Sequence, residues 1–334
     1  MGYSHQASGY TSAIKWGQRI FLGFWACVFS VVLYAQSYPT KSIRLVVGYP
    51  AGGATDIAAR TVAQKLSDAF SLSVIVDNRP GAASNLGAEM VARAAPDGYT
   101  LFLGSVSMAI NPSLYAKLTY DPIHDFVAVA HVASTPFLLV VHPSVPIKSV
   151  KELISYVKAH PGQVNYATAG KGSGGHLFME LFASQSALKM VRIDYRGAAA
   201  ATTDVLSGQV PMMFDNIFTT LPLSRSGKFR ALAVSTIQRS PIAPDIPTVS
   251  ESGLSGYDAN AWFGLFAPSA TPREIVARLN AEVVKGLQTS DMKERLRTLG
   301  ASAGGGSAES FASFFQEDTK KWARVIKAAS ITPE

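Results

Sequence analysis

Two segments of this chain share one pattern, in which an apolar strand runs into a glycine-rich turn and then into the start of a helix. The first spans residues 43–60 (IRLVVGYPAGGATDIAAR), and the second spans residues 164–181 (VNYATAGKGSGGHLFMEL). The first amides of a helix have no partners within the helix, and together with the helix dipole they attract an anion. Two such turns in one chain predict a cleft that closes on a small carboxylate.

The N-terminal 35 residues have the layout of an export signal. Lys15 and Arg19 supply a basic segment, and an uncharged apolar run follows from residue 20 to residue 35. The polar, proline-containing sequence QSYP comes next. This order is typical of a secretory signal peptide, and the run is short for a membrane span. We therefore expect cleavage near Ala35 and a periplasmic location, with a retained N-terminal anchor as the alternative.

The composition of the mature chain excludes several classes of function. Cys27 is the single cysteine and lies within the predicted signal peptide, so the mature chain has no disulfides and no thiol chemistry. The formal net charge of +7 falls to +5 when Lys15 and Arg19 are removed. The basic residues are scattered and form no Lys/Arg run, so we expect no nucleic-acid partner.

Short apolar strands alternate with stretches of helical periodicity after position 38. This alternation predicts an α/β fold with parallel sheets and crossover helices. A chain of this length usually forms two packed cores rather than one. The expected strands cover residues 43–48, 74–76, 100–104, 137–141, 165–168, 191–195, 212–214, 231–235 and 264–267.

Several of the expected helices carry start or stop signals. Ser149 and Glu152 form a capping box. Thr271 is expected as an N-cap, with Pro272 at the first helical position, and Gly300 is expected to end a later C-terminal turn. The last helix carries an apolar stripe that predicts a core-facing surface, made of Phe311, Phe314, Phe315, Trp322, Val325 and Ile326.

The proline-rich segments and the strand pattern suggest that the chain crosses between two lobes twice, near residues 137–143 and near residues 257–262. Two crossings make a hinge, which suits closure around a ligand. The expected division is a signal peptide at residues 1–35, a first lobe at residues 36–137 plus 262–334, and a second lobe at residues 138–261.

Neither glycine turn fits a nucleotide site well. The first turn lacks the lysine of a Walker A loop. The second matches the pattern GxGxxG through Gly170, Gly172 and Gly175, with Asp194 nineteen residues beyond, which is a formal dinucleotide fingerprint. Nicotinamide cofactors are not free in the periplasm, so the export signal argues against this alternative, and we expect no cofactor.

Three titratable residues lie near the turns. Asp56 would sit in a first helical turn, where the dipole stabilises an acid in any case. Asp215 would follow a strand, either as an acceptor for a ligand ammonium or hydroxyl or as a turn-forming residue. His176 would be a ligand contact or a satisfied first-turn residue, while Thr168 and Ser173 offer hydroxyl donors. The chain has no GxSxG elbow and no metal-ligand spacing of histidines, so we expect neither a metal nor enzyme activity.

A set of short motifs extends along nearly the whole mature chain. In order they are Tyr38-Pro39, Pro50-Ala51-Gly52-Gly53 with Asp56 and Arg60, Asn78-Arg79-Pro80-Gly81-Ala82 with Asn85 and Gly87-Ala88, Pro96-Asp97-Gly98-Tyr99-Thr100-Leu101, Gly172-Ser173 with His176-Leu177, Tyr195-Arg196-Gly197, Gly208-Gln209-Val210 and Ile246-Pro247-Thr248. Each is weak alone, but in this order they are specific. From Tyr38 to Ile331 the chain resembles the substrate-binding proteins of tripartite tricarboxylate transporters, the Bug family of extracytoplasmic solute receptors.

The resemblance implies a type II periplasmic-binding-protein fold, with two α/β lobes and a ligand cleft between them. It also implies that the two turns grip a ligand carboxylate, partly through bridging waters. Ser84 stands where family members often have glycine, and its hydroxyl either alters the distal specificity or caps a helix. No arginine clamp is obvious. The expected ligand-binding residues are Tyr49, Pro50, Ala51, Gly52, Gly53, Asp56, Ser84, Asn85, Ser105, Thr168, Ala169, Gly172, Ser173, His176, Gly197 and Asp215.

The function implied by the resemblance is a periplasmic receptor that captures a di- or tricarboxylate, or a similar organic acid, and delivers it to a membrane permease. A sensory binding module that reports to a sensor protein is the alternative. An enzyme acting on a carboxylic substrate is a third possibility, and it would need Asp215 or His176 as a base. The sequence leaves the solute and the oligomeric state open.

Overall fold

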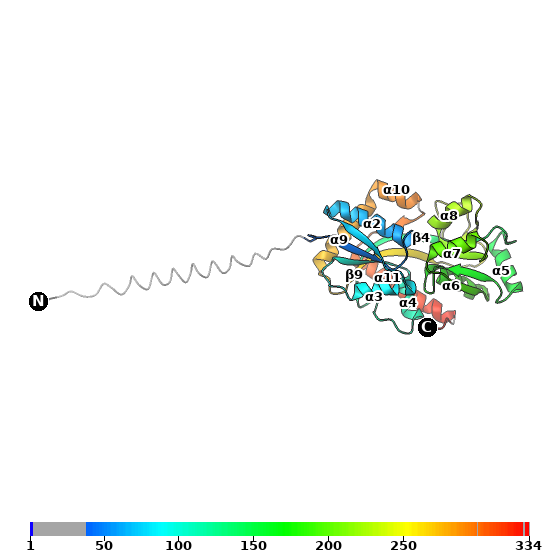
Figure 1. The fold of residues 1–334 in the computed structure, drawn as a ribbon, viewed down its shortest axis with the longest axis horizontal. Coiled ribbons are helices and arrows are strands. Elements are labelled where there is room, and N and C mark those ends of the chain that lie inside the picture. The colour runs from blue at the N-terminus through cyan, green and yellow to red at the C-terminus, as the bar shows by residue number, and fades with distance from the viewer. Residues whose placement is uncertain (3–37, 299, 330, 334) are drawn as a thin grey trace. The chain divides into compact units, whose positions relative to one another are not determined.

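A computed structural model describes residues 1–2, 38–298, 300–329 and 331–333 of the chain (Figure 1). The apolar run of the predicted signal peptide and its cleavage position lie outside these residues. The chain divides into the unit Met1–Thr40 and the unit Lys41–Glu334, and the fold described below is that of the second. Within the described ranges, no helix has both the length and the apolar character that a membrane crossing requires.

The first of two sheets is built mainly from the N-terminal strands. Strand β1 pairs in parallel with its neighbours on both sides, while β9 is antiparallel to both β3 and β4. The short β10 (Ser302–Ala303) pairs with β4. The order is β2 (Val74–Asn78), β1 (Ile43–Val47), β3 (Thr100–Ser105), β9 (Asn260–Pro268) and β4 (Phe126–Val141).

The second sheet begins on the far half of β4. Residues of β4 up to Pro136 pair with β9, whereas residues from Phe137 onward pair with β7 and β8. One strand therefore belongs to both sheets. The strands that complete the second sheet are β7 (Met212–Asn216), β8 (Arg230–Val234), β5 (Asn165–Thr168) and β6 (Val191–Asp194), with β5 parallel to both β6 and β7.

Helices connect the parallel strands and cover both sheets, which confirms the predicted α/β class. Figure 1 shows α5 to α8 gathered around the second sheet. The helices are α2 (Ala54–Phe70), α3 (Asn85–Ala92), α4 (Ser107–Leu114), α5 (Val150–Ala159), α6 (Gly174–Ser186), α7 (Ala198–Leu206), α8 (Ile217–Arg225), α9 (Arg273–Gln288), α10 (Ser290–Thr298) and α11 (Ala308–Ala328), with a 3₁₀ turn η2 (Ala82–Ser84).

A serine ties the two connections between the sheets together. The backbone amide of Phe137 donates to Ser235 Oγ at 2.9 Å, and the same hydroxyl donates to the carbonyl of Ala259 at 2.6 Å. Ser235 is completely buried. The point at which β4 passes from one sheet to the other is thus linked to the segment that leads into β9.

The helix signals are largely confirmed. Ser149 Oγ accepts from the amide of Glu152 at 3.2 Å and caps α5, and Gly300 has the positive φ of +71° expected after α10. The prediction for α9 is wrong by one residue. The helix begins at Arg273, and Pro272 occupies the N-cap position. The Thr271 side chain is buried and makes no hydrogen bond, so it cannot serve as the cap.

Strand β4 is much longer than predicted, because it starts at Phe126 rather than at Phe137. Pro136 marks the place where the sequence resembles a strand end, since proline cannot donate to a ladder. In the structure Pro136 is the last β4 residue paired with β9, and the strand continues into the second sheet.

The apolar stripe of α11 packs into the core through Phe311, Phe315, Trp322 and Ile326, whereas Phe314 is 40% exposed. A polar residue sits within this stripe. Asp318 Oδ2 accepts hydrogen bonds from Nε1 of Trp262 at 2.7 Å and from Nε1 of Trp322 at 3.1 Å. One buried carboxylate therefore satisfies two buried indoles and fixes Trp262, a residue of β9.

We expect Asp318→Leu to lower the free energy of unfolding by about 2–4 kcal/mol, because two buried indole N–H groups lose their acceptor. The Asp318→Asn variant keeps an oxygen acceptor and is the matched control, with a smaller loss. Urea unfolding followed by tryptophan fluorescence measures both. A leucine variant as stable as the unmodified protein would show that the pair of bonds contributes nothing.

Candidate functional site

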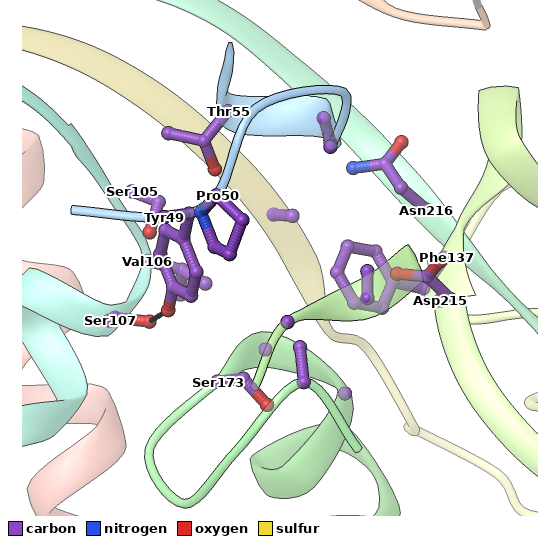
Figure 2. A pocket seen from close by; sticks show the side chains of 18 of the residues that line it. Tyr49, Pro50, Thr55, Ser105, Val106, Ser107, Phe137, Ser173, Asp215 and Asn216 are labelled. Atoms are coloured by element: carbon purple, nitrogen blue, oxygen red, sulfur yellow. Dashed lines mark hydrogen bonds between the residues drawn. The ribbon is translucent and has the colours of Figure 1, made fainter. Parts of the chain in front are cut away.

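A cavity of about 90 Å³ lies where strand ends of both sheets meet (Figure 2). This space is large enough to hold water or a small solute. Five strand-to-helix turns contribute to its wall, together with residues of the strands β4 and β9. The lining residues are Tyr49, Pro50, Ala51, Gly53, Ala54, Thr55, Ser105, Val106, Ser107, Phe137, Ala169, Ser173, Gly174, Gly175, Arg196, Gly197, Ala198, Ala199, Phe214, Asp215, Asn216, Ala261, Trp262 and Phe263.

Three helices place their first two residues on this wall. Ala54 and Thr55 open α2, Gly174 and Gly175 open α6, and Ala198 with Ala199 opens α7. The starts of α2 and α7 carry no side-chain cap. Their first amides have no partner within the helix, and the dipoles add partial positive charge at the same ends. The cavity is therefore suited to an anion.

The first glycine turn is braced from behind by Asp56. Its carboxylate accepts from the amide of Gly52 at 3.0 Å, from Arg60 Nε at 2.9 Å and from Asn78 Nδ2 at 3.0 Å. Burial alone would raise the pKa of Asp56, but the hydrogen bonds from Arg60 and Gly52 outweigh it and lower the pKa. Asn78 also donates to the carbonyl of Tyr49. Asp56 thus holds the shape of the turn.

The second turn is braced in a comparable way. The amide of Gly172 donates to Nδ1 of His176 at 3.1 Å. Thr168 Oγ1 bonds to both the carbonyl and the amide of Gly170, and it lies 3.0 Å from Ser173 Oγ. Burial and the charge of a nearby arginine lower the pKa of His176 to about 3, so its ring is neutral. The Gly172 amide is used inside the turn.

Two of the predicted residues lie away from the cavity wall, because Ser84 ends η2 and Asn85 opens α3. Asn85 Oδ1 accepts from Asn111 Nδ2 and from the Tyr120 hydroxyl, both at 2.7 Å. Ser84 occupies the N-cap position of α3 but makes no capping hydrogen bond, so the capping prediction is wrong. It is buried against Gly48, where a Cβ atom would come within 1.8 Å of its hydroxyl oxygen.

The structure brings together part of the predicted set. Nine predicted residues line the cavity: Tyr49, Pro50, Ala51, Gly53, Ser105, Ala169, Ser173, Gly197 and Asp215. Seven predicted residues lie outside its wall: Gly52, Asp56, Ser84, Asn85, Thr168, Gly172 and His176.

Figure 2 shows how the polar side chains are arranged. The Tyr49 hydroxyl lies 2.7 Å from Ser107 Oγ, and burial raises the pKa of Tyr49, so the phenol stays neutral. Asp215 Oδ2 accepts from the Thr219 hydroxyl at 2.9 Å. Burial raises the pKa of Asp215 to about 6. Asp215 is therefore close to its titration point at neutral pH.

Sequence reasoning missed the third helix start and the apolar wall. Arg196 and the first residues of α7 reach the cavity, and their signal was the glycine at the end of β6, Gly197, with a φ of +117°. Arg196 and Asp215 are the charged residues on the described wall. Trp262 and Phe263 come from β9, far along the chain, and no local motif indicates them.

Segments attached to the two sheets approach one another at three places. The Tyr115 hydroxyl donates to the carbonyl of Lys171 at 3.2 Å. Gly172 faces Asn111 so closely that a Cβ atom would lie 2.5 Å from Asn111 Oδ1. Gly197 faces Pro50 in the same manner, at 3.1 Å. Among the described residues, no three His, Cys, Asp or Glu side chains are grouped to hold a metal ion.

Comparison with known proteins identifies the family. The family model described as the tripartite tricarboxylate transporter family receptor matches residues 58–331. BugT of Bordetella pertussis is 35% identical over 295 residues, which are 88% of this chain and 90% of BugT. The structure of R. palustris Rpa4515 with adipate has 36% identity and a TM-score of 0.86, covering 89% of this chain and 100% of that chain.

A second solved structure agrees. MatC (Rpa3494) from Rhodopseudomonas palustris with bound malate has 35% identity and a TM-score of 0.83, and it covers 86% of this chain and 100% of that chain. These similarities confirm the fold class expected from the sequence. The chain belongs to the receptor family of the tripartite tricarboxylate transporters.

Proposed function

We propose that this protein is a periplasmic receptor that binds a small carboxylate in the cavity and delivers it to the membrane permease of a tripartite tricarboxylate transporter. The observation that carries the proposal is the convergence of three helix N-termini, those of α2, α6 and α7, on one cavity. Its relatives Rpa4515 and MatC are described with adipate and with malate, so organic acids of this size are the first ligands to test.

The wall offers contacts for both the carboxylate groups and the carbon chain of such an acid. Each helix N-terminus contributes roughly 0.3–2 kcal/mol toward a negative charge. Thr55, Ser105 and Ser173 place hydroxyl-bearing side chains on the same wall. Aromatic side chains, including Phe137 and Trp262, supply apolar surface for the carbon chain. The apolar and polar parts of the wall together resemble a typical small-molecule site.

The contacts around the cavity favour a mechanism in which two lobes close on the ligand. We assign residues 36–137 plus 262–334 to the first lobe and residues 138–261 to the second. The ladder of β4 changes partners between Pro136 and Phe137, which supports a boundary there. Closure around a bound acid would exclude water and strengthen each charge interaction in the cavity.

Export through a cleaved signal at residues 1–35 would place the receptor in the periplasm, in agreement with its family. We also propose that it returns its ligand unchanged. His176, which an enzyme of this kind would need as a base, is buried behind the wall and bonded to Gly172. Asp215 has a threonine rather than a histidine as its side-chain partner.

Thermal shift and calorimetry with adipate and malate test the proposal. A ligand that binds only the folded protein raises its melting temperature, so we expect both acids, or one of them, to do so. Hexane-1,6-diol, which has the carbon chain of adipate without its charges, is the control and should have no effect. Mass spectrometry of the acid released from the protein should show that it is unchanged. No stabilisation by any organic acid, or conversion of the acid, would contradict the proposal.

Alanine substitutions at two glycines of the turns give a second test of the site. Gly172 and Gly52 have φ values of +82° and +85°, so alanine costs about 1–2 kcal/mol of backbone strain at either position. At Gly172 the added methyl also meets Asn111 Oδ1 of α4 at 2.5 Å, whereas at Gly52 it meets no atom within 4 Å. We therefore expect Gly172→Ala to weaken acid binding by roughly tenfold or more, equivalent to about 1.4 kcal/mol.

The Gly52→Ala variant is the matched control, because it has the same strain without the clash. Calorimetry gives the affinities, and thermal unfolding without ligand shows that both variants fold. Equal losses of affinity in the two variants would mean that the contact with Asn111 is irrelevant to binding.

Asp215 should make acid binding depend on pH. Below its pKa of about 6 the carboxyl is neutral, and above it the added negative charge opposes an anionic ligand. Affinity for adipate should therefore fall as the pH rises from about 5 to about 8, by up to roughly tenfold per pH unit above the pKa. Titration of adipate itself affects the unmodified protein and the Asp215→Asn variant equally. The ratio of their affinities at each pH therefore reports the effect of Asp215 alone. Parallel pH profiles would contradict this prediction.

A further inference from the structure

We propose that His176 is a positioning residue for the ligand site, which acts by taking up the amide of Gly172 and thereby presenting the amides of Gly174 and Gly175 to the cavity. This role goes beyond the proposed function. The binding part of its test rests on that function, whereas a second part does not.

His176 is bonded to the turn at two places. Its ring nitrogen Nδ1 accepts from the Gly172 amide at 3.1 Å, and its own amide donates to Ser173 Oγ at 3.4 Å. The side chain is completely buried and lies outside the cavity wall. A residue that touches the turn on two sides, and the ligand space on none, determines the direction of its backbone.

The surroundings of the ring identify which nitrogen accepts. A neutral imidazole has one acceptor nitrogen. Both ring nitrogens face donors, because Nε2 lies 2.9 Å from Arg192 Nη1 and Nδ1 lies 3.1 Å from the Gly172 amide, so the neutral ring can accept from only one of them. The Arg192 side chain is 26% exposed and binds Asp194 through Nε, so its Nη1 can turn to water, whereas Gly172 is buried and its amide would be left without a partner. We therefore assign the lone pair to Nδ1 and the proton to Nε2, and Arg192 Nη1 must then turn away from that proton.

The amides of this turn therefore have different roles. Gly172, with φ of +82°, directs its amide inward to the histidine, so this amide is withdrawn from the ligand. The next residues, Gly174 and Gly175, lie on the wall, and their amides have no partner in the helix. Without an acceptor at Nδ1 the Gly172 amide must turn to another partner, and residues 173–175 turn with it.

Two variants separate the acceptor from the rest of the side chain. In His176→Asn the amide oxygen can stand at the position of Nδ1 and accept from Gly172. In His176→Gln the polar group stands at the position of Nε2, toward Arg192, and Gly172 loses its acceptor. Calorimetry with adipate and malate should give an affinity within about threefold of the unmodified protein for His176→Asn, and a loss of roughly tenfold or more for His176→Gln.

The second part of the test needs no ligand. Hydrogen exchange at the Gly172 amide, followed by nuclear magnetic resonance, should be slow in the unmodified protein and in His176→Asn, and much faster in His176→Gln. A residue that only fills space would change the melting temperature of the two variants without separating their exchange rates or affinities.

The outcomes are distinct. Equal affinities for His176→Asn and His176→Gln, or fast exchange of the Gly172 amide in the unmodified protein, would overturn the inference. If the unmodified protein binds no acid at all, the proposed function fails, and the exchange rates alone decide the role of His176. If a variant does not fold, the exchange rate in the unmodified protein still decides it.

Discussion

The first amides of a helix must find partners outside the helix, and this requirement organises the site. Helices α2, α6 and α7 place their first residues on the wall of one cavity, while the amides of two nearby glycines bind side chains outside the wall. Asp56 takes up the amide of Gly52, and His176 takes up that of Gly172. The amides that remain for a ligand are therefore selected by the bonds that the neighbouring amides already make.

The charge balance of the cavity follows from the same arrangement. Helix N-termini contribute partial positive charge at the wall, and among the described lining residues the charged side chains are Arg196 and Asp215. Asp215 is buried, and burial raises its pKa to about 6. A site of this kind distinguishes acids mainly by shape and by hydrogen-bond donors, because its electrostatic preference for any carboxylate is broad.

Short sequence patterns predicted the features that depend on neighbouring residues in the chain. The two glycine turns and their helices follow from short-range sequence signals, and the cap of α5 is where Ser149 indicates. The inward direction of the Gly172 amide could not be read from the sequence, because it depends on a ring four residues away that is equally suited to binding a ligand. Trp262 reaches the wall through the pairing of β9 with β3 and β4, a long-range contact with no motif. Thr271 lost its capping role to burial.

Ser235 has a mechanical consequence. Its hydroxyl bridges the Phe137 amide and the Ala259 carbonyl, so both backbone passages between the sheets are fastened at a common pivot. Passages joined in this way must twist in concert, and bending one alone would break a buried bond. If one half moves against the other when an acid binds, this shared bond favours rotation of the two halves about Ser235 over bending of one passage alone.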